Sequence, residues 1–134
     1  MAITTTGNPH ITKIQTAIDC YFGDGLTRQG AISKTLPELA LTDVDIKQVQ
    51  IAIGATETFA SATVFGSSAD FKFVGIFVND NSTTPLMQVE IHNSGHLIDC
   101  IDTFVISGSA VTDQVEIKNN SGANVLNITL ILGR

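Results

Sequence analysis

One strand-and-turn phrase occurs twice in this chain. Residues 88–95 read Gln-Val-Glu-Ile-His-Asn-Ser-Gly, and residues 114–122 read Gln-Val-Glu-Ile-Lys-Asn-Asn-Ser-Gly. Residues 48–54, Gln-Val-Gln-Ile-Ala-Ile-Gly, are a weaker echo. Each copy alternates apolar and polar residues before a turn, which predicts a half-buried strand that leads into a hairpin. A hairpin used at least twice in a short chain predicts a β-sandwich or barrel, in which one face of each strand is buried against a second sheet.

Alternating or β-branched segments, separated by Asn, Ser and Gly turns, fill the chain after residue 42. The second half of Phe71–Val78 is apolar on both faces, which indicates a central strand that is covered on both sides. Strands do not alternate with helices, so a parallel sheet is not expected. The spacing predicts an all-β fold, an antiparallel β-sandwich or jelly-roll-like barrel of about seven to nine short strands. The expected strands are 44–53, Thr58–Phe65, Phe71–Val78, Leu86–Ile91, Leu97–Ile106, Gln114–Lys118 and 124–132.

The beginning of the chain is less regular. Three isoleucines at helical spacing permit a short helix over residues 11–20. The same Ile and Thr residues also favour extended chain, and the tight-turn dipeptide Asp24-Gly25 favours a hairpin in this segment. We therefore expect two units, residues 1–41 as an irregular N-terminal arm or first hairpin and residues 42–134 as the sandwich body.

The chain carries few charges. Of its 134 residues, 43% are hydrophobic and only 15% are charged, whereas about 25% are charged in typical soluble domains. Thr, Ser, Asn and Gly must therefore cover much of the surface, and we expect part of that surface to contact other subunits. The net charge is −6, so the basic footprint of a nucleic-acid-binding protein is missing and no nucleic-acid partner is expected.

We recognise no signal for export or for membrane insertion in the sequence. Residues 1–7 have neither the basic start nor the apolar run of a signal peptide, so we expect synthesis in the cytoplasm. No apolar stretch approaches the roughly 18 residues that a membrane-spanning helix needs, and no membrane contact is expected. Cys20 and Cys100 lack a Cys-x-x-Cys spacing. We expect them to be reduced and buried rather than joined in a disulfide.

His92, His96, Asp99, Cys100 and Asp102 form the densest cluster of potential metal ligands. On a helix, the spacing of His92, His96 and Cys100 would place three ligands on one face. The surrounding sequence predicts a turn and strands instead, and two residues four apart on a straight strand are separated by about 13 Å. We therefore expect two exposed histidines beside a turn, a buried thiol and no metal site.

Two pairs of carboxylates, Asp43 with Asp45 and Asp99 with Asp102, could serve acid–base or calcium chemistry. Neither pair has the Asp-x-Asp-x-Asp-Gly pattern of a calcium loop, and solvation at strand ends accounts for both. Residues 107–109, Ser-Gly-Ser, lie between expected strands and not at the strand-to-helix elbow of a serine hydrolase. No phosphate-binding glycine motif is present. We therefore expect no enzymatic activity, no catalytic residue and no cofactor.

The strand-and-turn phrase at residues 115–122 and the apolar strand at 127–134, in a chain rich in Thr, Ser, Asn and Gly, resemble small structural proteins of tailed bacteriophages. The resemblance is greatest to capsid decoration (cement) proteins and covers roughly residues 44–134. It implies a virion protein with a β-sandwich or jelly-roll body that binds the outside of a capsid, often as a homotrimer. The implied partners are further copies of the chain and the major capsid protein or other virion subunits. Residues 1–41 would form an arm that reaches a neighbour or the shell.

Three other functions compete with this one. A tail or connector subunit of the same virion would assemble into rings or tubes. A receptor- or glycan-binding β-sandwich module would carry an aromatic-lined groove. A metal-dependent enzyme would use His92, His96 and Cys100. We rank virion structure first, the binding module second and the enzyme last.

Overall fold

The computed structural model describes residues 15–21, 28–35, 41–79, 86–92 and 94–134, and of the first two ranges it describes the backbone. Regular structure in these ranges is almost entirely β-strand, with a short helix, α1 (Ser61–Phe65). No described helix has the length and the apolar character needed to cross a membrane. The strands are β1 (Gln15–Tyr21), β2 (Arg28–Thr35), β3 (Val44–Ile51), β4 (Thr56–Ala60), β5 (Phe71–Val78), β6 (Met87–Ile91), β7 (Ile98–Cys100), β8 (Thr103–Thr112), β9 (Gln114–Asn119) and β10 (Leu126–Gly133).

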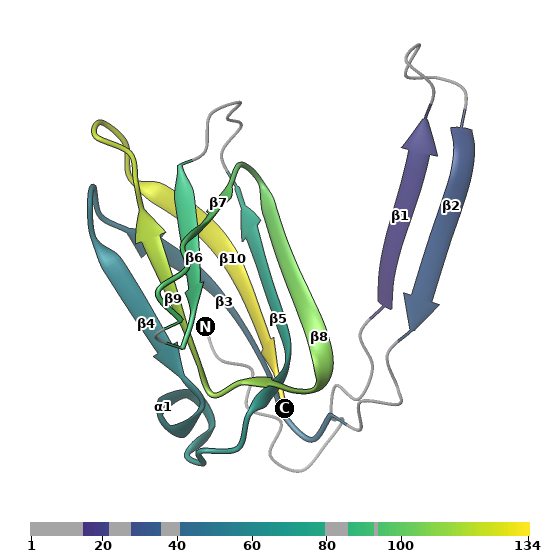
Figure 1. Ribbon diagram of the computed structural model, residues 1–134, viewed down its shortest axis with the longest axis horizontal. Coiled ribbons are helices and arrows are strands. Elements are labelled where there is room, and N and C mark those ends of the chain that lie inside the picture. Colours follow the sequence, from purple (N-terminus) through teal and green to yellow (C-terminus); the bar gives the residue numbers. More distant parts are fainter. Residues whose placement is uncertain (1–14, 22–27, 36–40, 80–85, 93) are drawn as a thin grey trace.

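The strands after residue 42 form two packed sheets. One four-stranded sheet has the order β3-β10-β5-β8, and the other has the order β4-β9-β6-β7 (Figure 1). All pairings within them are antiparallel. The predicted all-β antiparallel sandwich is therefore confirmed. The two sheets are not joined into one closed ring, so the barrel alternative is wrong.

The order of pairing follows a simple nested rule. β3 pairs with β10, β4 with β9, β5 with β8 and β6 with β7, so the chain forms one long antiparallel ribbon folded at the β6–β7 turn. The additional pairs β10–β5 and β9–β6 join successive turns of this ribbon. A ribbon rolled in this way is a jelly roll.

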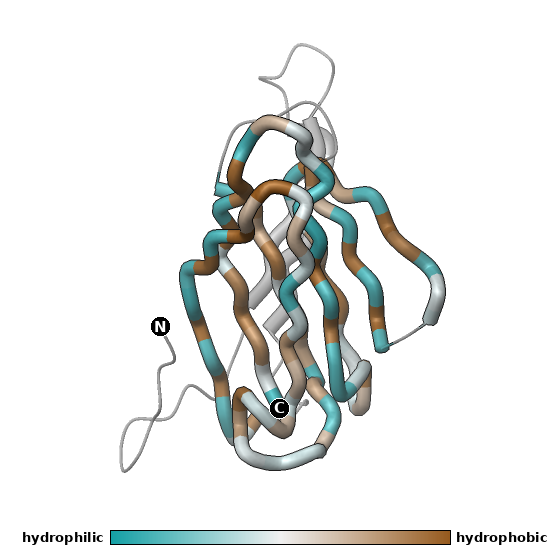
Figure 2. The backbone as a smooth tube through the Cα atoms, turned by 90° about the vertical axis from the view of Figure 1, so that its left-hand side faces the viewer, coloured by the Kyte–Doolittle hydropathy of each residue, from teal (hydrophilic) through white to brown (hydrophobic). Residues whose placement is uncertain are grey.

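Alternation along the strands builds the core between the two sheets. Figure 2 shows the alternation as apolar and polar bands along the backbone. Each fully buried aliphatic side chain contributes about 1.5–3 kcal/mol of burial free energy relative to an exposed one. The core receives Leu126, Ile128, Leu130 and Leu132 from β10, Val74, Ile76 and Val78 from β5, and Met87, Val89, Val115 and Ile117 from the other sheet.

The two copies of the repeated phrase become neighbouring strands. They are β6 and β9, which pair antiparallel with Val89 opposite Ile117. The first copy leads into a hairpin with β7, as predicted. The second copy leads into β10, which belongs to the other sheet, so the prediction of a second hairpin is wrong. The two phrases share a local pattern, but the nested order of strand pairing determines which strand the next segment pairs with.

Two expected strands are interrupted where the chain passes from one sheet to the other. The strand expected over Thr58–Phe65 ends at Ala60, and the short helix α1 follows. Gly66 ends this helix in the left-handed conformation, with a φ of 73°, as is common at helix C-termini. β4 and β5 lie in different sheets, so the chain between them must turn away from β4.

The strand expected over Leu97–Ile106 is likewise two strands. β7 belongs to one sheet and β8 to the other, and the chain crosses between them at Ile101 and Asp102. Gly108 does not separate two strands. It lies inside β8, at the start of a stretch that has no regular partner, because Ser107 pairs with Phe73 and the next pair joins Thr112 to Phe71.

β1 and β2 form a hairpin of their own. They pair antiparallel, with Gln15 opposite Thr35, as a two-stranded sheet that joins neither sheet of the sandwich. Figure 1 shows this hairpin apart from the sandwich. Residues 15–20 are therefore strand and not the last part of a helix over residues 11–20, whose other residues lie outside the described ranges. Whether residues 1–41 reach a neighbour stays a prediction.

Gly75 is required by close packing on the outer face of the β3-β10-β5-β8 sheet. A Cβ atom at this position would lie 2.9 Å from Phe73 Cε1 and 3.0 Å from Phe77 Cε2. The two aromatic rings therefore approach each other over the glycine, in the middle of a central strand. Gly108 has more room, because its added Cβ would meet Val111 Cγ2 at 3.6 Å.

We predict that Gly75→Ala lowers the free energy of unfolding by about 1–3 kcal/mol, because the added methyl group overpacks the space between two rings. Gly108→Ala is the matched control and should leave the stability unchanged or slightly raised, since alanine loses less backbone entropy on folding. Urea unfolding of both variants and the parent chain measures the difference. Equal midpoints for Gly75→Ala and the parent would contradict the packing described here.

Candidate functional site

The predicted histidine–cysteine cluster is dispersed in the structure. His92 Nδ1 forms an ion-pair contact with Asp113, in the segment between β8 and β9. His96 is exposed in the turn before β7, and its backbone N–H donates to Ser94 Oγ at 3.2 Å. Cys100 is buried on the core side of β7. Within the described residues, no three His, Cys, Asp or Glu side chains are grouped closely enough to hold a metal ion.

Cys100 carries a free, buried thiol, whereas the side chain of Cys20 lies outside the described set. Burial raises the pKa of the Cys100 thiol, and the neighbouring negative charge of Asp99 raises it further. Both effects disfavour the thiolate, which is the nucleophilic form of cysteine. The environment is the opposite of the electropositive setting that activates a catalytic thiol.

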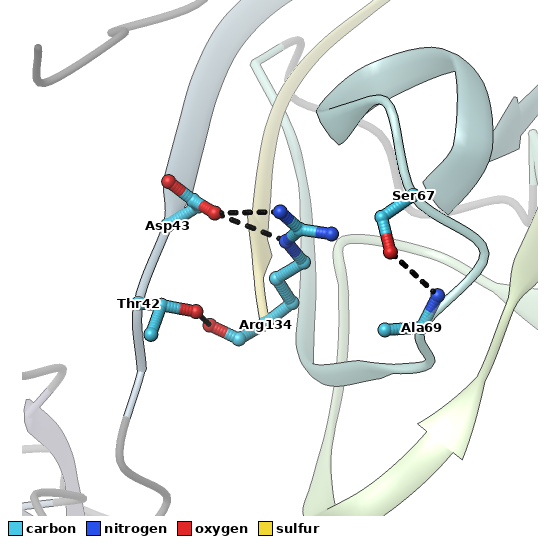
Figure 3. Close-up of polar contacts among 5 residues, drawn as sticks. All are labelled: Thr42, Asp43, Ser67, Ala69 and Arg134. Atoms are coloured by element: carbon cyan, nitrogen blue, oxygen red, sulfur yellow. Dashed lines mark hydrogen bonds and ion pairs between the residues drawn. The ribbon is translucent and has the colours of Figure 1, made fainter.

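Asp43 and Asp45 have separate partners and do not act as a pair. Asp43 accepts hydrogen bonds at Oδ2 from Arg134 Nε and Nη2, at 3.0 and 2.9 Å (Figure 3). Thr42 Oγ1 donates to the Arg134 carbonyl at 3.1 Å, and the guanidinium lies 5.2 Å from the Phe65 ring centre. These contacts attach the end of β10 to the start of β3.

Asp45 is buried, at 2% exposure, so the prediction that it is a surface carboxylate is wrong. Its Oδ2 lies 2.8 Å from Lys47 Nζ, and neither carboxylate oxygen has a hydrogen-bond partner beyond this ion pair. The register places Asp45 opposite Leu132 and Lys47 opposite Leu130, on the core side of β3. Lys47 Nζ also lies 5.5 Å from the centre of the Phe59 ring on β4. This inward-pointing charged pair sits on an edge strand.

The remaining sequence candidates have ordinary structural roles. Asp99 accepts a hydrogen bond from Gln88 Nε2 at 2.8 Å across the β6–β7 hairpin. Asp102 lies in the crossing between sheets, where its carbonyl accepts from the Val78 N–H at 2.8 Å. Residues 107–109 belong to β8. No arrangement of a nucleophile with a base is present among these residues.

The feature that requires a functional explanation is the outer face of the β3-β10-β5-β8 sheet. Its side chains alternate with the core residues and form four aligned columns. No member of this set is charged, and we call it the uncharged face. It consists of Val44, Ile46, Gln48 and Gln50 of β3, Asn127, Thr129, Ile131 and Gly133 of β10, Phe73, Gly75 and Phe77 of β5, and Thr103, Val105 and Ser107 of β8.

The middle of the uncharged face is an apolar row. Ile46, Ile131, Gly75 and Val105 lie side by side across all four strands. Val105 is 42% exposed, whereas Phe73 is 1% exposed although it lies outside the main core. Ile46 and Ile131 are half-buried and Gly75 is buried, so the exposed apolar area of this row is largest at the β8 edge. Contiguous exposed apolar area is typical of surfaces that bind another protein.

Polar groups beside this row satisfy one another without charge. Asn79 Nδ2 donates to Gln48 Oε1 at 2.8 Å, and Thr129 Oγ1 lies 3.1 Å from Gln48 Oε1 and 3.0 Å from Asn79 Oδ1. Gln50 Nε2 donates to Asn127 Oδ1 at 3.1 Å. Amides and hydroxyls that are already paired cost less to bury than free charges. The polar part of the face is therefore also suited to be covered.

The outer face of the other sheet has the opposite character. Glu90 of β6 lies directly opposite Glu116 of β9, and Gln88 lies opposite Lys118. Gln114 Nε2 donates to Glu116 Oε1 at 3.2 Å, and the Gly95 N–H donates to Glu90 Oε1 at 2.8 Å. Facing carboxylates repel each other and retain their water. The sandwich thus has one face suited to solvent and one suited to a partner.

Comparison with known proteins gives no family for this chain: no family model matches it, and no similar curated protein or solved structure was found.

Sequence reasoning predicted a charge-poor surface but did not locate it. The missing information was the strand order, because the face is assembled from strands far apart in the chain. A signal was nevertheless present. Uncharged residues occupy every second position of four segments, and the same alternation in β6 and β9 places Glu and Lys there.

We predict that Cys100 reacts slowly with iodoacetamide in the folded protein. In a Cys20→Ser chain, the alkylation rate at pH 8 should be at least about tenfold below that of the urea-unfolded chain, because burial suppresses the thiolate. As the pH is raised, the alkylation rate of the folded chain should increase with a midpoint above the pKa of the unfolded thiol. The contribution of Cys100 to the free energy of unfolding should decline as the pH rises through the pKa of the folded thiol. A folded midpoint at or below the unfolded one would contradict the burial of Cys100.

Proposed function

We propose that this protein is a virion structural protein that self-associates through the uncharged face and binds the outside of a phage capsid to stabilise it. The observation that carries the proposal is the uncharged face itself, which crosses the β3-β10-β5-β8 sheet without a charged side chain. Interface cores are depleted of charged residues in the same way. Glu90, Glu116 and Lys118 on the opposite face would keep the assembly soluble.

The fold supports this proposal at the level of analogy. Double-sheet jelly rolls are frequent in viral capsid and lectin domains. A fold alone does not determine function. A homotrimer on the capsid surface is the assembly we propose, because three weakly binding arms or edges held on one particle act at a high effective concentration.

The proposed assembly is tested on the purified full-length chain by light scattering and electron microscopy. Discrete trimers that add to capsids and raise their resistance to heat support the proposal. Rings or tubes would instead assign the chain to a tail or connector subunit. A monomer at all concentrations would contradict self-association, and the receptor- or glycan-binding module would become the better hypothesis.

A charged side chain introduced on the uncharged face should dissociate the assembly into monomers. We predict that Val105→Lys lowers the solution mass to that of a monomer, because the lysine ammonium would be buried without a partner in the contact. Val105 is exposed in the single chain, so the free energy of unfolding of the monomer should change by only about 0.5 kcal/mol.

Thr58→Lys is the matched control for this substitution. Thr58 is an exposed strand residue on the outer face of β4, opposite Glu116. The Thr58→Lys chain should keep the parent mass. If Val105→Lys also keeps the parent mass, the uncharged face is not the contact surface.

A further inference from the structure

The four edges of the sandwich are not equally protected. A strand at the edge of a sheet exposes unpaired N–H and C=O groups, and proteins protect such edges with charges, proline or short strands. β3 carries the inward-pointing pair Asp45 and Lys47. β4 carries Glu57, and β7 has three residues that include Asp99. β8 is the exception, because its ten residues, Thr-Phe-Val-Ile-Ser-Gly-Ser-Ala-Val-Thr, contain neither charge nor proline.

The regular part of the β8 edge is Thr103–Ser107. These residues pair with Phe73–Phe77 of β5 on one side, and β8 is the last strand of its sheet on the other side. The next paired residue is Thr112, so the irregular stretch begins only after Ser107. Among the described residues no strand pairs with the outer side of Thr103–Ser107, so this segment presents an open row of backbone donors and acceptors next to the apolar row of the uncharged face.

The hairpin of β1 and β2, in turn, has no third strand among the described residues. It is a two-stranded sheet that pairs with neither sheet of its own chain. A two-stranded hairpin without a third strand or a packed face is at best marginally stable in water. Both the hairpin and the β8 edge are completed if a strand of the hairpin adds to β8 by main-chain hydrogen bonds.

We propose that the β1–β2 hairpin of one copy adds to the free edge of β8 in a second copy, extending the β3-β10-β5-β8 sheet across the subunit boundary. This contact deepens the proposed function and rests on it, since it names the way in which copies are joined. The exchange is head to tail, and a threefold rotation between copies closes it into the proposed trimer, in which every hairpin and every β8 edge is paired. Pairing of β8 with β8 would close a dimer and leave both hairpins uncovered, which makes the hairpin the better occupant.

The proposal is tested by cross-linking in the full-length chain. Every chain carries Cys20→Ser, and Cys100 stays in place because it is buried. One tagged chain receives a cysteine in the hairpin, by Ala17→Cys or Ser33→Cys, two positions that pair across β1 and β2. A second, differently tagged chain receives Ser107→Cys on β8, where the side chain is exposed. The two chains are co-expressed, treated with a short bismaleimide and compared with chains that lack the added cysteine.

The expected result is a covalent pair of the two tagged chains, at least about tenfold above the product of either chain alone. Linking of Ser107→Cys to itself would overturn the proposal in favour of β8 pairing with β8. A chain that carries both cysteines and links within one monomer would overturn it in favour of pairing with its own hairpin.

Light scattering of the same samples distinguishes a failure of the hairpin contact from a failure of self-association. If the sample is assembled and the hairpin does not link to β8, the hairpin contact is wrong while the proposed self-association stands. If the sample is monomeric and no link forms, both the hairpin contact and the proposed self-association are wrong.

Discussion

The position of β10 between β3 and β5 is the constraint on which the rest of this structure depends. β10 pairs along its whole length with β3 and over most of it with β5, although these partners come from the first half of the sandwich. Its inward residues Leu126, Ile128, Leu130 and Leu132 are all fully buried. The contact of Arg134 with Asp43 and the Thr42–Arg134 bonds then hold the end of β10 beside the start of β3.

The same strand also organises the surface that we assign to assembly. The outward residues of β10 alternate with the core leucines and supply the middle of the uncharged face. Ile131 lies between Ile46 and Gly75, so the apolar row continues from one edge of the sheet toward the other. The core and the proposed contact surface are thus two sides of one sheet. The absence of charge on its outer side and the uncharged β8 edge point to the same region of the molecule as the contact with other copies.

Local pattern was sufficient to predict most of the strands. Alternation in β6 and β9 also identified the face that is buried. In β3 it did not, because Ile46 lies on the outer face whereas Asp45 and Lys47 lie on the core side. Local pattern did not identify the crossings between sheets at α1 and at Asp102, because these depend on which sheet the next strand joins. The burial of Asp45 was missed for a related reason, since a carboxylate near a strand end is usually solvated and only the neighbouring Lys47 compensates its charge. The exposure of His92 and His96 and the burial of Cys100 were predicted from the turn and the strand, whereas the distance between the three residues could not be predicted.

Hydroxyl-radical footprinting of the full-length protein, read by mass spectrometry over a range of concentrations, tests most directly whether the uncharged face is covered in solution. We predict that oxidation of Ile46, Phe77, Val105 and Ile131 falls as the protein assembles, while oxidation of the exposed Leu97 and Ile53 stays constant. Equal oxidation of the first set at all concentrations, or equal loss at both sets, would contradict it.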